Sequence, residues 1–432
     1  MIDREILELL NAGDVGERLN ALCEIAERTD FPERDPRYIN NHVHTCYSFS
    51  PYSPTAAVYS AADAGLCTVG IIDHDSIGGV KEFLEAADIL AMPATSGLEF
   101  RVDVSDLPMG DRRINNPDQD GIIYMTVQGL PESGRAEMEA FLKPLRAARN
   151  ERNRAMTDKL NELLAPYDMA LDFDRDIVPL SQADEGGSIT ERHLMYALAL
   201  KLADTLGKGQ PIIDFFAKQD IALGEKDIAK LEDTEHPFYA YDLLGILKAH
   251  FIGKIYLPAK AECPSLDDAV AIAEKTGGIL CYAYLGDVVA SVTGDKKAQV
   301  FEDGFLDELL KELTDRGVKA LTYMPARNTP EQLARLRELC ERYELFQISG
   351  EDINSPRQDF ICHAMENPVF ENLIRATWAL IVHERVANGH PERGFFGSET
   401  VKRFPDIKAR VDHFVAEAAE MFPDAEVPAV TD

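Results

Sequence analysis

The sequence has little positive charge for its size. It carries 44 Lys and Arg residues against 75 Asp and Glu residues, which gives a formal net charge of −31 at pH 7. Nucleic-acid binding depends on Lys and Arg side chains that neutralise phosphates, so this balance argues against a nucleic-acid partner. A local positive site for a small anionic substrate is still compatible with an acidic surface.

Signals for membranes and disulfide bonds are also missing. No apolar run approaches the roughly 18 residues of a membrane span, and the first residues, MIDREILELL, lack the basic start and apolar core of a signal peptide. The seven cysteines are scattered without a CxxC pair. These absences predict a cytoplasmic protein with reduced thiols and no membrane partner, and they leave the oligomeric state open.

What is present is a chain long enough for a large α/β core. With 432 residues, 45% of them hydrophobic, one barrel with insertions fits as well as two domains. Apolar runs such as CTVGIID alternate with helical segments such as SIGGVKEFLEAADIL. A β-α-β-α-β order predicts parallel strands joined by helical crossovers. We expect an N-terminal helical extension (1–38), a first barrel part (39–131), a helical insertion or cap (132–265), a second barrel part (266–360) and C-terminal helices (361–432).

The sharpest motif lies at the end of the first predicted strand, in the run NNHVHT. Residues two apart on a strand point to the same side, so His42 and His44 can present two imidazoles to one metal ion. Two histidines with structural roles are the alternative at this point.

Further metal-binding residue types follow the next strands. Asp73, His74 and Asp75 end the second strand, Glu99 follows a third, and Asp352 follows the strand LFQIS. Active sites of parallel barrels lie at the carboxyl ends of the strands. We therefore predict a His, Asp and Glu metal site at one mouth of a barrel.

These motifs resemble the PHP (polymerase and histidinol phosphatase) family. Its members typically have paired histidines near the start, T-D-H-D on the second strand, a glutamate on the third, an R-x-H segment and a late G-S-D-x-H. The corresponding positions here are His42 and His44, Asp73-His74-Asp75, Glu99, Arg192-His193 and Asp352. The resemblance is dense over 39–101 and 268–360. It implies a distorted TIM-like (β/α)7 barrel of the PHP type with a helical insertion, one to three divalent ions (Zn, Mn or Fe) and hydrolysis of phosphate esters.

The resemblance also implies roles for individual residues. One ion would be held by His42, His44, Glu99 and Asp352, a second by His74, and a third by Glu99 and His193. Asp73, His74 and Asp352 would be catalytic, with Asp73 or Asp75 orienting the His74 ring. We predict that Arg101, Arg192, Asn354 and Tyr284 bind the anionic substrate, the arginines through their guanidinium groups.

Several positions depart from the family pattern, and each departure removes a metal ligand or an acid-base group. The late histidine is replaced by Asn354, and the family's A-H-P reads Ala283-Tyr284-Leu285. The other replacements are Asn40 for an aspartate, Phe49 or Ser50 for an aspartate or histidine, and Tyr124 for a strand histidine.

Three functions follow for comparison. The first is a hydrolase that uses a metal-activated water on a small phosphate ester. The second is a non-catalytic or divergent PHP-fold protein that keeps one ion in a binding role. The third is an exonuclease or proofreading module, against which the charge of −31 and the lack of a polymerase region argue.

Overall fold

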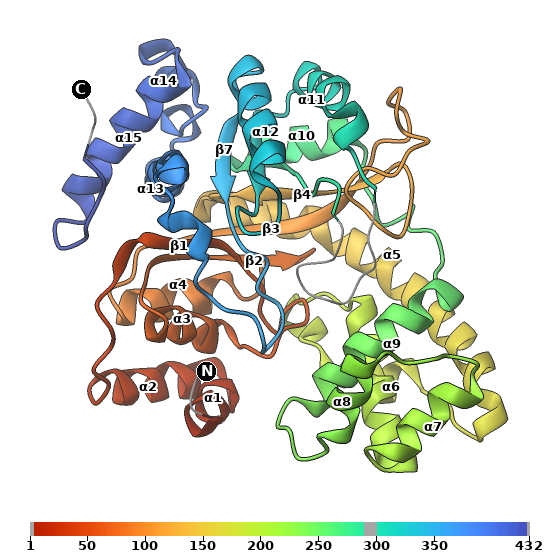
Figure 1. Cartoon of the computed structure of the whole chain (residues 1–432). Coiled ribbons are helices and arrows are strands. Elements are labelled where there is room, and N and C mark those ends of the chain that lie inside the picture. The colour runs from red at the N-terminus through yellow and green to blue at the C-terminus, as the bar shows by residue number, and fades with distance from the viewer. Residues whose placement is uncertain (1–3, 289–299, 430–432) are drawn as a thin grey trace.

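The protein, described by a computed structural model over residues 4–288 and 300–429, is built around one sheet of seven strands. The strands follow one another in chain order, from β1 to β7 (Figure 1). Beyond the last strand, Ile353 forms a parallel bridge to Val43 of β1, so the sheet nearly closes into a barrel. The strands are β1 (Asp35–Val43), β2 (Leu66–His74), β3 (Ala94–Asp103), β4 (Ile122–Gln128), β5 (Ile279–Ala283), β6 (Ala320–Tyr323) and β7 (Phe346–Ser349). The predicted TIM-like barrel is confirmed as a distorted one.

The distortion comes from β4. The pairs β1–β2, β2–β3, β5–β6 and β6–β7 are parallel, whereas β4 runs antiparallel to both β3 and β5. The parallel strands predicted from the β-α-β-α-β order are confirmed for β1 to β3, and the sequence predicts no direction for β4. The reason for the antiparallel direction of β4 is the connection 104–121, a loop without a crossover helix, which returns the chain at the same end of the barrel.

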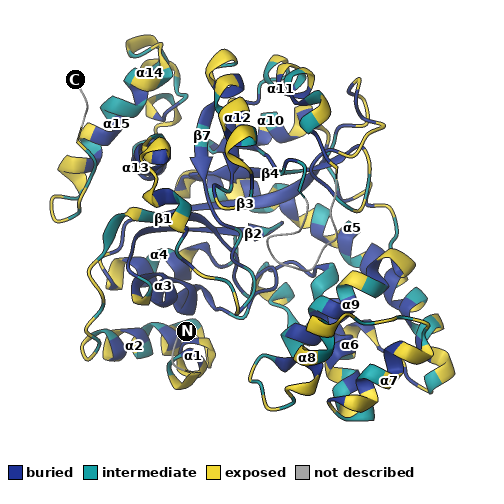
Figure 2. Cartoon of the chain, viewed as in Figure 1, coloured by how far each residue is buried: buried dark blue, intermediate teal, exposed yellow. Residues whose placement is uncertain are grey.

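Helices cover the barrel in the order expected for β-α units. Helix α3 (Pro54–Asp63) begins as predicted, because Ser53 accepts a hydrogen bond from the Ala56 amide and Pro54 takes the first helical position. The strands are buried and most outer helices expose one face (Figure 2), whereas α3 is buried from Pro54 to Ala62. The remaining barrel helices are α4 (Val80–Ile89), α10 (Leu266–Thr276), α11 (Leu306–Asp315), α12 (Pro330–Arg342) and α13 (Glu371–Val386).

The N-terminal segment, predicted as a helical extension over 1–38, contains two helices in its described residues. It forms α1 (Arg4–Asn11) and α2 (Val15–Ala26), separated at Asp14, whose capping box with Glu17 starts the second helix. Strand β1 already begins at Asp35. Residues 1–3 of this segment and 430–432 of the predicted C-terminal region lie outside the described residues. The C-terminal region contains α14 (Ser398–Arg403) and α15 (Ile407–Met421) after α13.

The helical insertion has a hydrophobic core of its own, beside the barrel (Figure 1). Its members within the described chain all lie between Met156 and Ile255, except Phe49, which comes from the barrel loop after β1. The helices of the insertion are α5 (Glu132–Leu164), α6 (Glu191–Leu206), α7 (Gln210–Lys218), α8 (Glu225–Glu232) and α9 (Tyr239–Ile255). Helix α5 belongs to both cores, with Met138 and Leu142 packed in the barrel and Met156 and Leu160 in the insertion.

Among the described helices, none is both long and apolar enough to cross a membrane. The boundaries drawn at 39, 132, 266 and 361 stay predictions.

Candidate metal centre

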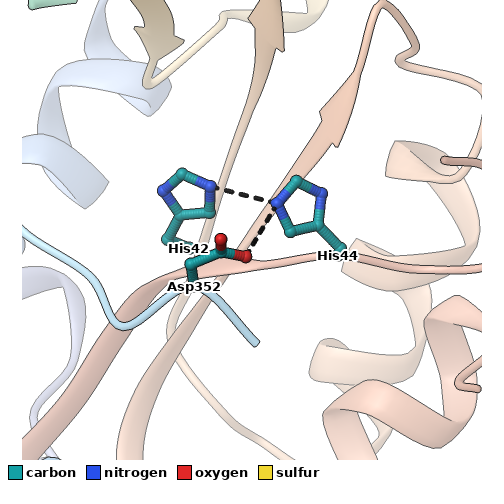
Figure 3. Close-up of side chains that lie close together, drawn as sticks. All are labelled: His42, His44 and Asp352. Atoms are coloured by element: carbon teal, nitrogen blue, oxygen red, sulfur yellow. Dashed lines mark hydrogen bonds and ion pairs between the residues drawn. The ribbon is translucent and has the colours of Figure 1, made fainter. Parts of the chain in front are cut away.

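Five side chains of metal-binding type meet at the carboxyl ends of the barrel strands. They form two groups that share His44, and within each group the ligand atoms lie within 4.8 Å of one another. Three of them are drawn in Figure 3: His42 near the end of β1, His44 directly after this strand, and Asp352 on the segment after β7. The groups are His42, His44 and Asp352, and His44, His74 and Glu99.

The distances between ligand atoms suit one ion. His44 Nε2 lies 3.2 Å from His42 Nε2 and 3.2 Å from Asp352 Oδ1. Tetrahedral ligands with metal bonds of 2.0–2.1 Å are separated by about 3.4 Å, close to these values. Glu99 Oε2 lies 4.0 Å from His42 Nε2 and 3.0 Å from His74 Nδ1, which joins the second group to the first.

The tautomer of His44 is set by its neighbours. Ser48 Oγ donates a hydrogen bond to Asp73 Oδ1 over 2.6 Å, so it must accept from the His44 Nδ1–H that lies 3.1 Å away. The lone pair of His44 Nε2 is then free to face His42 and Asp352. Metal-bound histidines are usually oriented by such a partner on the other ring nitrogen.

The electrostatics of the centre favour a bound cation. Burial, together with the neighbouring His44, lowers the pKa of His42 to about 4, so its imidazole is neutral and can bind a metal. Burial raises the pKa of Glu99 to about 8, because a carboxylate is costly in this environment without a nearby positive charge. Two buried lone pairs and two carboxylates around one point match the donor set of Zn(II), Mn(II) or Fe(II). The residues present therefore fit a divalent ion.

A pocket of about 180 Å³ opens beside these residues. His42, His74, Glu99 and Asp352 lie on its wall. Its other polar walls come from Asn115, Tyr124, Tyr284 and Asn354, and from Arg192 of α6 and Lys248 of α9 in the helical insertion. The pocket is smaller than the roughly 300–1,000 Å³ of most ligand sites, so it suits a small molecule.

Asp73 takes a different place from the one expected. Its carboxylate accepts hydrogen bonds from the Thr45 amide and hydroxyl and from Ser48, so it supports the loop after β1. It therefore acts on His44 through Ser48, instead of touching substrate or orienting His74. Asp75, the other candidate for orienting His74, pairs with Arg149 of α5.

Arg101 is also placed away from the predicted role. Its guanidinium is buried and forms ion pairs with Glu191 and Glu262. A guanidinium already paired with two carboxylates is not available to hold a substrate anion, so the assignment of Arg101 to substrate binding is corrected.

His193 and Tyr124 do not form a third metal site within the described residues. His193 Nδ1 accepts the Thr190 amide at the start of α6, and its ring packs against Phe49. Its Nε2 is buried without a hydrogen-bond partner, and it is not among the atoms that converge on Glu99. Tyr124 reaches the pocket and packs against the His74 ring, with 5.9 Å between ring centroids.

The remaining predicted substrate residues do line the pocket. Tyr284 is one of them, although its hydroxyl donates to Asp303 over 2.7 Å. Arg192 Nη1 donates to Asn354 Oδ1 over 3.0 Å, at the pocket wall. Lys248 was missed, because nothing in the helical pattern of α9 separates this lysine from a surface one.

One of two similar solved structures supports the fold. A solved structure from Bifidobacterium adolescentis, assigned as a metal-dependent phosphoesterase, is 20% identical and superposes with a TM-score of 0.50, covering 79% of this chain and 98% of that one. An amidohydrolase from Chromobacterium violaceum is 19% identical, covers 78% of this chain and 96% of that one, and has a TM-score of 0.48.

Sequence comparison gives a shorter match. Error-prone DNA polymerases of Mycobacterium tuberculosis and Mycobacterium bovis are 31% identical over 100 residues, 23% of this chain. The match covers only 9% of the length of those polymerases. No family model matches the sequence.

Proposed function

We propose that this chain is a metal-dependent hydrolase of the PHP type that cleaves small phosphate esters. The observation that carries the proposal is the convergence of His42, His44, His74, Glu99 and Asp352 beside one pocket. A divalent ion bound there lowers the pKa of a water to about 7 and polarises a phosphoryl oxygen. The solved phosphoesterase of similar fold supports the same class.

The protein's own residues have separate tasks in this proposal. His42, His44 and Glu99 would hold the ion, and Ser48 and Asp73 keep the His44 ring in position. Asp352 is the most open ligand, with 36% of its side chain exposed, against 11% for Glu99. It therefore lies on the side of the ion that faces the pocket, as a fourth ligand. His74, on the pocket wall, completes the set.

The substrate class follows from charge. Arg192 and Lys248 are the basic side chains on the wall of the pocket within the described chain. Guanidinium and ammonium groups both bind phosphate oxygens. We therefore assign them, with Asn354 and Tyr284 as polar neighbours, to binding a small phosphorylated molecule, and we propose no nucleic-acid or membrane partner.

The experiment measures metal content and turnover together. Protein purified without chelator is analysed for metal per chain, and hydrolysis of p-nitrophenyl phosphate is followed with added Mn(II) or Zn(II). We compare the wild type with His42→Ala, and with His390→Ala as a matched control, since 60% of the His390 side chain is exposed away from the pocket. Bound metal and metal-dependent turnover that His42→Ala alone abolishes would support the proposal.

A second candidate is a divergent protein that keeps one ion in a binding role. It is favoured by Asn354, which stands where the family has a histidine and whose amide hydrogen-bonds to Asp352. One ion per chain without turnover on any phosphate ester would favour this candidate, and no bound ion would contradict both.

A further inference from the structure

Asn354 lies between a metal ligand and the helical insertion. Its Nδ2 donates to Asp352 Oδ1 over 2.7 Å, on the same oxygen that faces His44. Its Oδ1 and its backbone carbonyl accept from the two terminal nitrogens of Arg192, over 3.0 and 3.2 Å. The Asn354 amide therefore connects Asp352 to α6.

Chemistry fixes the orientation of this amide. A guanidinium can only donate and an ionised carboxylate can only accept, so the oxygen must face Arg192 and the nitrogen must face Asp352. The backbone of Asn354 is held as well, because its backbone N–H donates to Gln358 Oε1 over 2.8 Å. A reversed side-chain amide would place its NH2 group against the Arg192 guanidinium and its oxygen against the Asp352 carboxylate, so neither hydrogen bond could form.

Arg192 is anchored by the barrel loop. Its guanidinium lies over the Phe49 ring, 5.2 Å from the ring centroid. Among the described residues, Phe49 is the one member of the insertion's core that comes from the barrel. Phe49 has a φ of 94°, in the left-handed region that aromatic residues rarely adopt. The packing of Phe49 in the core of the insertion, against His193 and Tyr196 of α6, supports this conformation. It also holds Arg192 beside Asn354.

We propose that Asn354 and Arg192 are positioning residues that fix Asp352 for metal binding, so that the helical insertion completes the metal centre of the barrel. The inference rests on the metal centre of the proposed function. Without the amide donor, Asp352 Oδ1 loses the contact that holds it toward His44. Partners of this kind typically contribute about 10–100-fold to metal affinity.

The test is a double-mutant cycle read out as metal affinity. Isothermal titration with Mn(II) or Zn(II) compares the wild type, Asn354→Ala, Arg192→Met and the double variant in the full chain. We expect Asn354→Ala to weaken binding by about 10–100-fold and Arg192→Met to weaken it less. Because Arg192 acts through Asn354, its substitution should have no further effect in the Asn354→Ala background.

Controls separate positioning from a loss of folding. Arg154→Met makes the same change on α5, where Arg154 pairs with Asp174 at the surface, and should leave metal affinity unchanged. Melting of the metal-free variants should match that control. Arg192→Lys keeps the charge but cannot donate to both Asn354 oxygens with the geometry of a guanidinium. Its metal affinity should therefore resemble that of Arg192→Met.

The outcomes are distinguishable. Unchanged affinity in Asn354→Ala and Arg192→Met, or additive losses in the double variant, would overturn this inference and leave the metal centre standing. A wild type that binds neither ion would overturn the metal centre and this inference together.

Discussion

Replacing Glu191 by glutamine should destabilise the protein strongly, although the substitution keeps the shape of the side chain. Glu191 lies at the start of α6 and forms ion pairs with Arg101 of β3 and with Arg149 and Arg152 of α5. Glu262 pairs with Arg101 and Arg152, and Asp75 with Arg149. Three guanidinium groups and three carboxylates thus balance, and all three arginines are buried.

The expected loss in the free energy of unfolding follows from removing one charge from this balanced set of six. Breaking a buried ion pair costs about 3–5 kcal/mol, because the remaining charge is left without compensation. For 432 residues, an unfolding entropy of about 2.1 cal/mol/K per residue converts this loss into a melting temperature lower by about 3–6 °C.

The effect should also depend on pH. Burial alone would raise the pKa of Glu191, but the charges of Arg149, Arg101 and Arg152 lower it well below its usual value. A carboxyl group with a lowered pKa stabilises the fold above its unfolded pKa of about 4.5, and this contribution is lost as the pH falls towards the folded pKa. The difference between wild type and Glu191→Gln should therefore be largest near pH 7.

Urea unfolding and thermal melting at pH 7 and pH 4 test this reasoning. Asp174→Asn, which breaks the surface pair with Arg154, is the control and should leave the midpoint unchanged. If the free energy of unfolding of Glu191→Gln at pH 7 lies within about 1 kcal/mol of the wild-type value, the view that these ion pairs are coupled and desolvated is refuted.

Three further predictions concern the pocket, the metal and a second buried carboxyl group. Lys248→Ala should raise KM for a phosphate ester about tenfold, since a charged hydrogen bond contributes about 1.5–3 kcal/mol, and leave metal content unchanged; an unaltered KM would exclude Lys248 from substrate binding. Chelation should lower the melting temperature, and re-added Mn(II) or Zn(II) at 100 times Kd should restore it, because such binding adds about 2.7 kcal/mol to the free energy of unfolding. A melting temperature that does not respond to metal would contradict the metal centre. Burial raises the pKa of Glu302 to about 7, so its stabilising effect is present below about pH 4.5 and lost as the pH rises through 7. Urea unfolding at pH 5 and pH 8 should show a smaller pH dependence for Glu302→Gln, and an equal one would count against this assignment.

Much of the barrel could be predicted because local sequence determines it. Ser53 and Pro54 mark the start of α3, and the apolar run CTVGIID is long enough for a buried strand but too short for most helices. The run IIYMTVQGL equally predicts a strand, yet nothing within it encodes a direction. The antiparallel β4 depends on how the loop 104–121 folds, and that is a property of distant contacts.

The metal-binding residue types could be found for the same reason, since each follows a strand. The contacts of Arg101 could not, because Glu191 and Glu262 lie about 90 and 160 positions further along the chain. Lys248 needs the fold of the insertion to reach the pocket. A hydrogen bond such as that from Asn354 to Asp352 leaves no spacing pattern, although the two residues are neighbours in sequence.

Helix α5 bears on how a substrate could enter. Its 33 residues extend over about 50 Å and are packed at one end in the barrel and at the other in the insertion. A hinge between the two bodies would have to bend this helix or pull Met156 and Leu160 out of their packing. Pro144 lies between the two packed ends and removes a backbone hydrogen bond of the helix, so we expect any movement of the insertion during turnover to bend α5 at this residue.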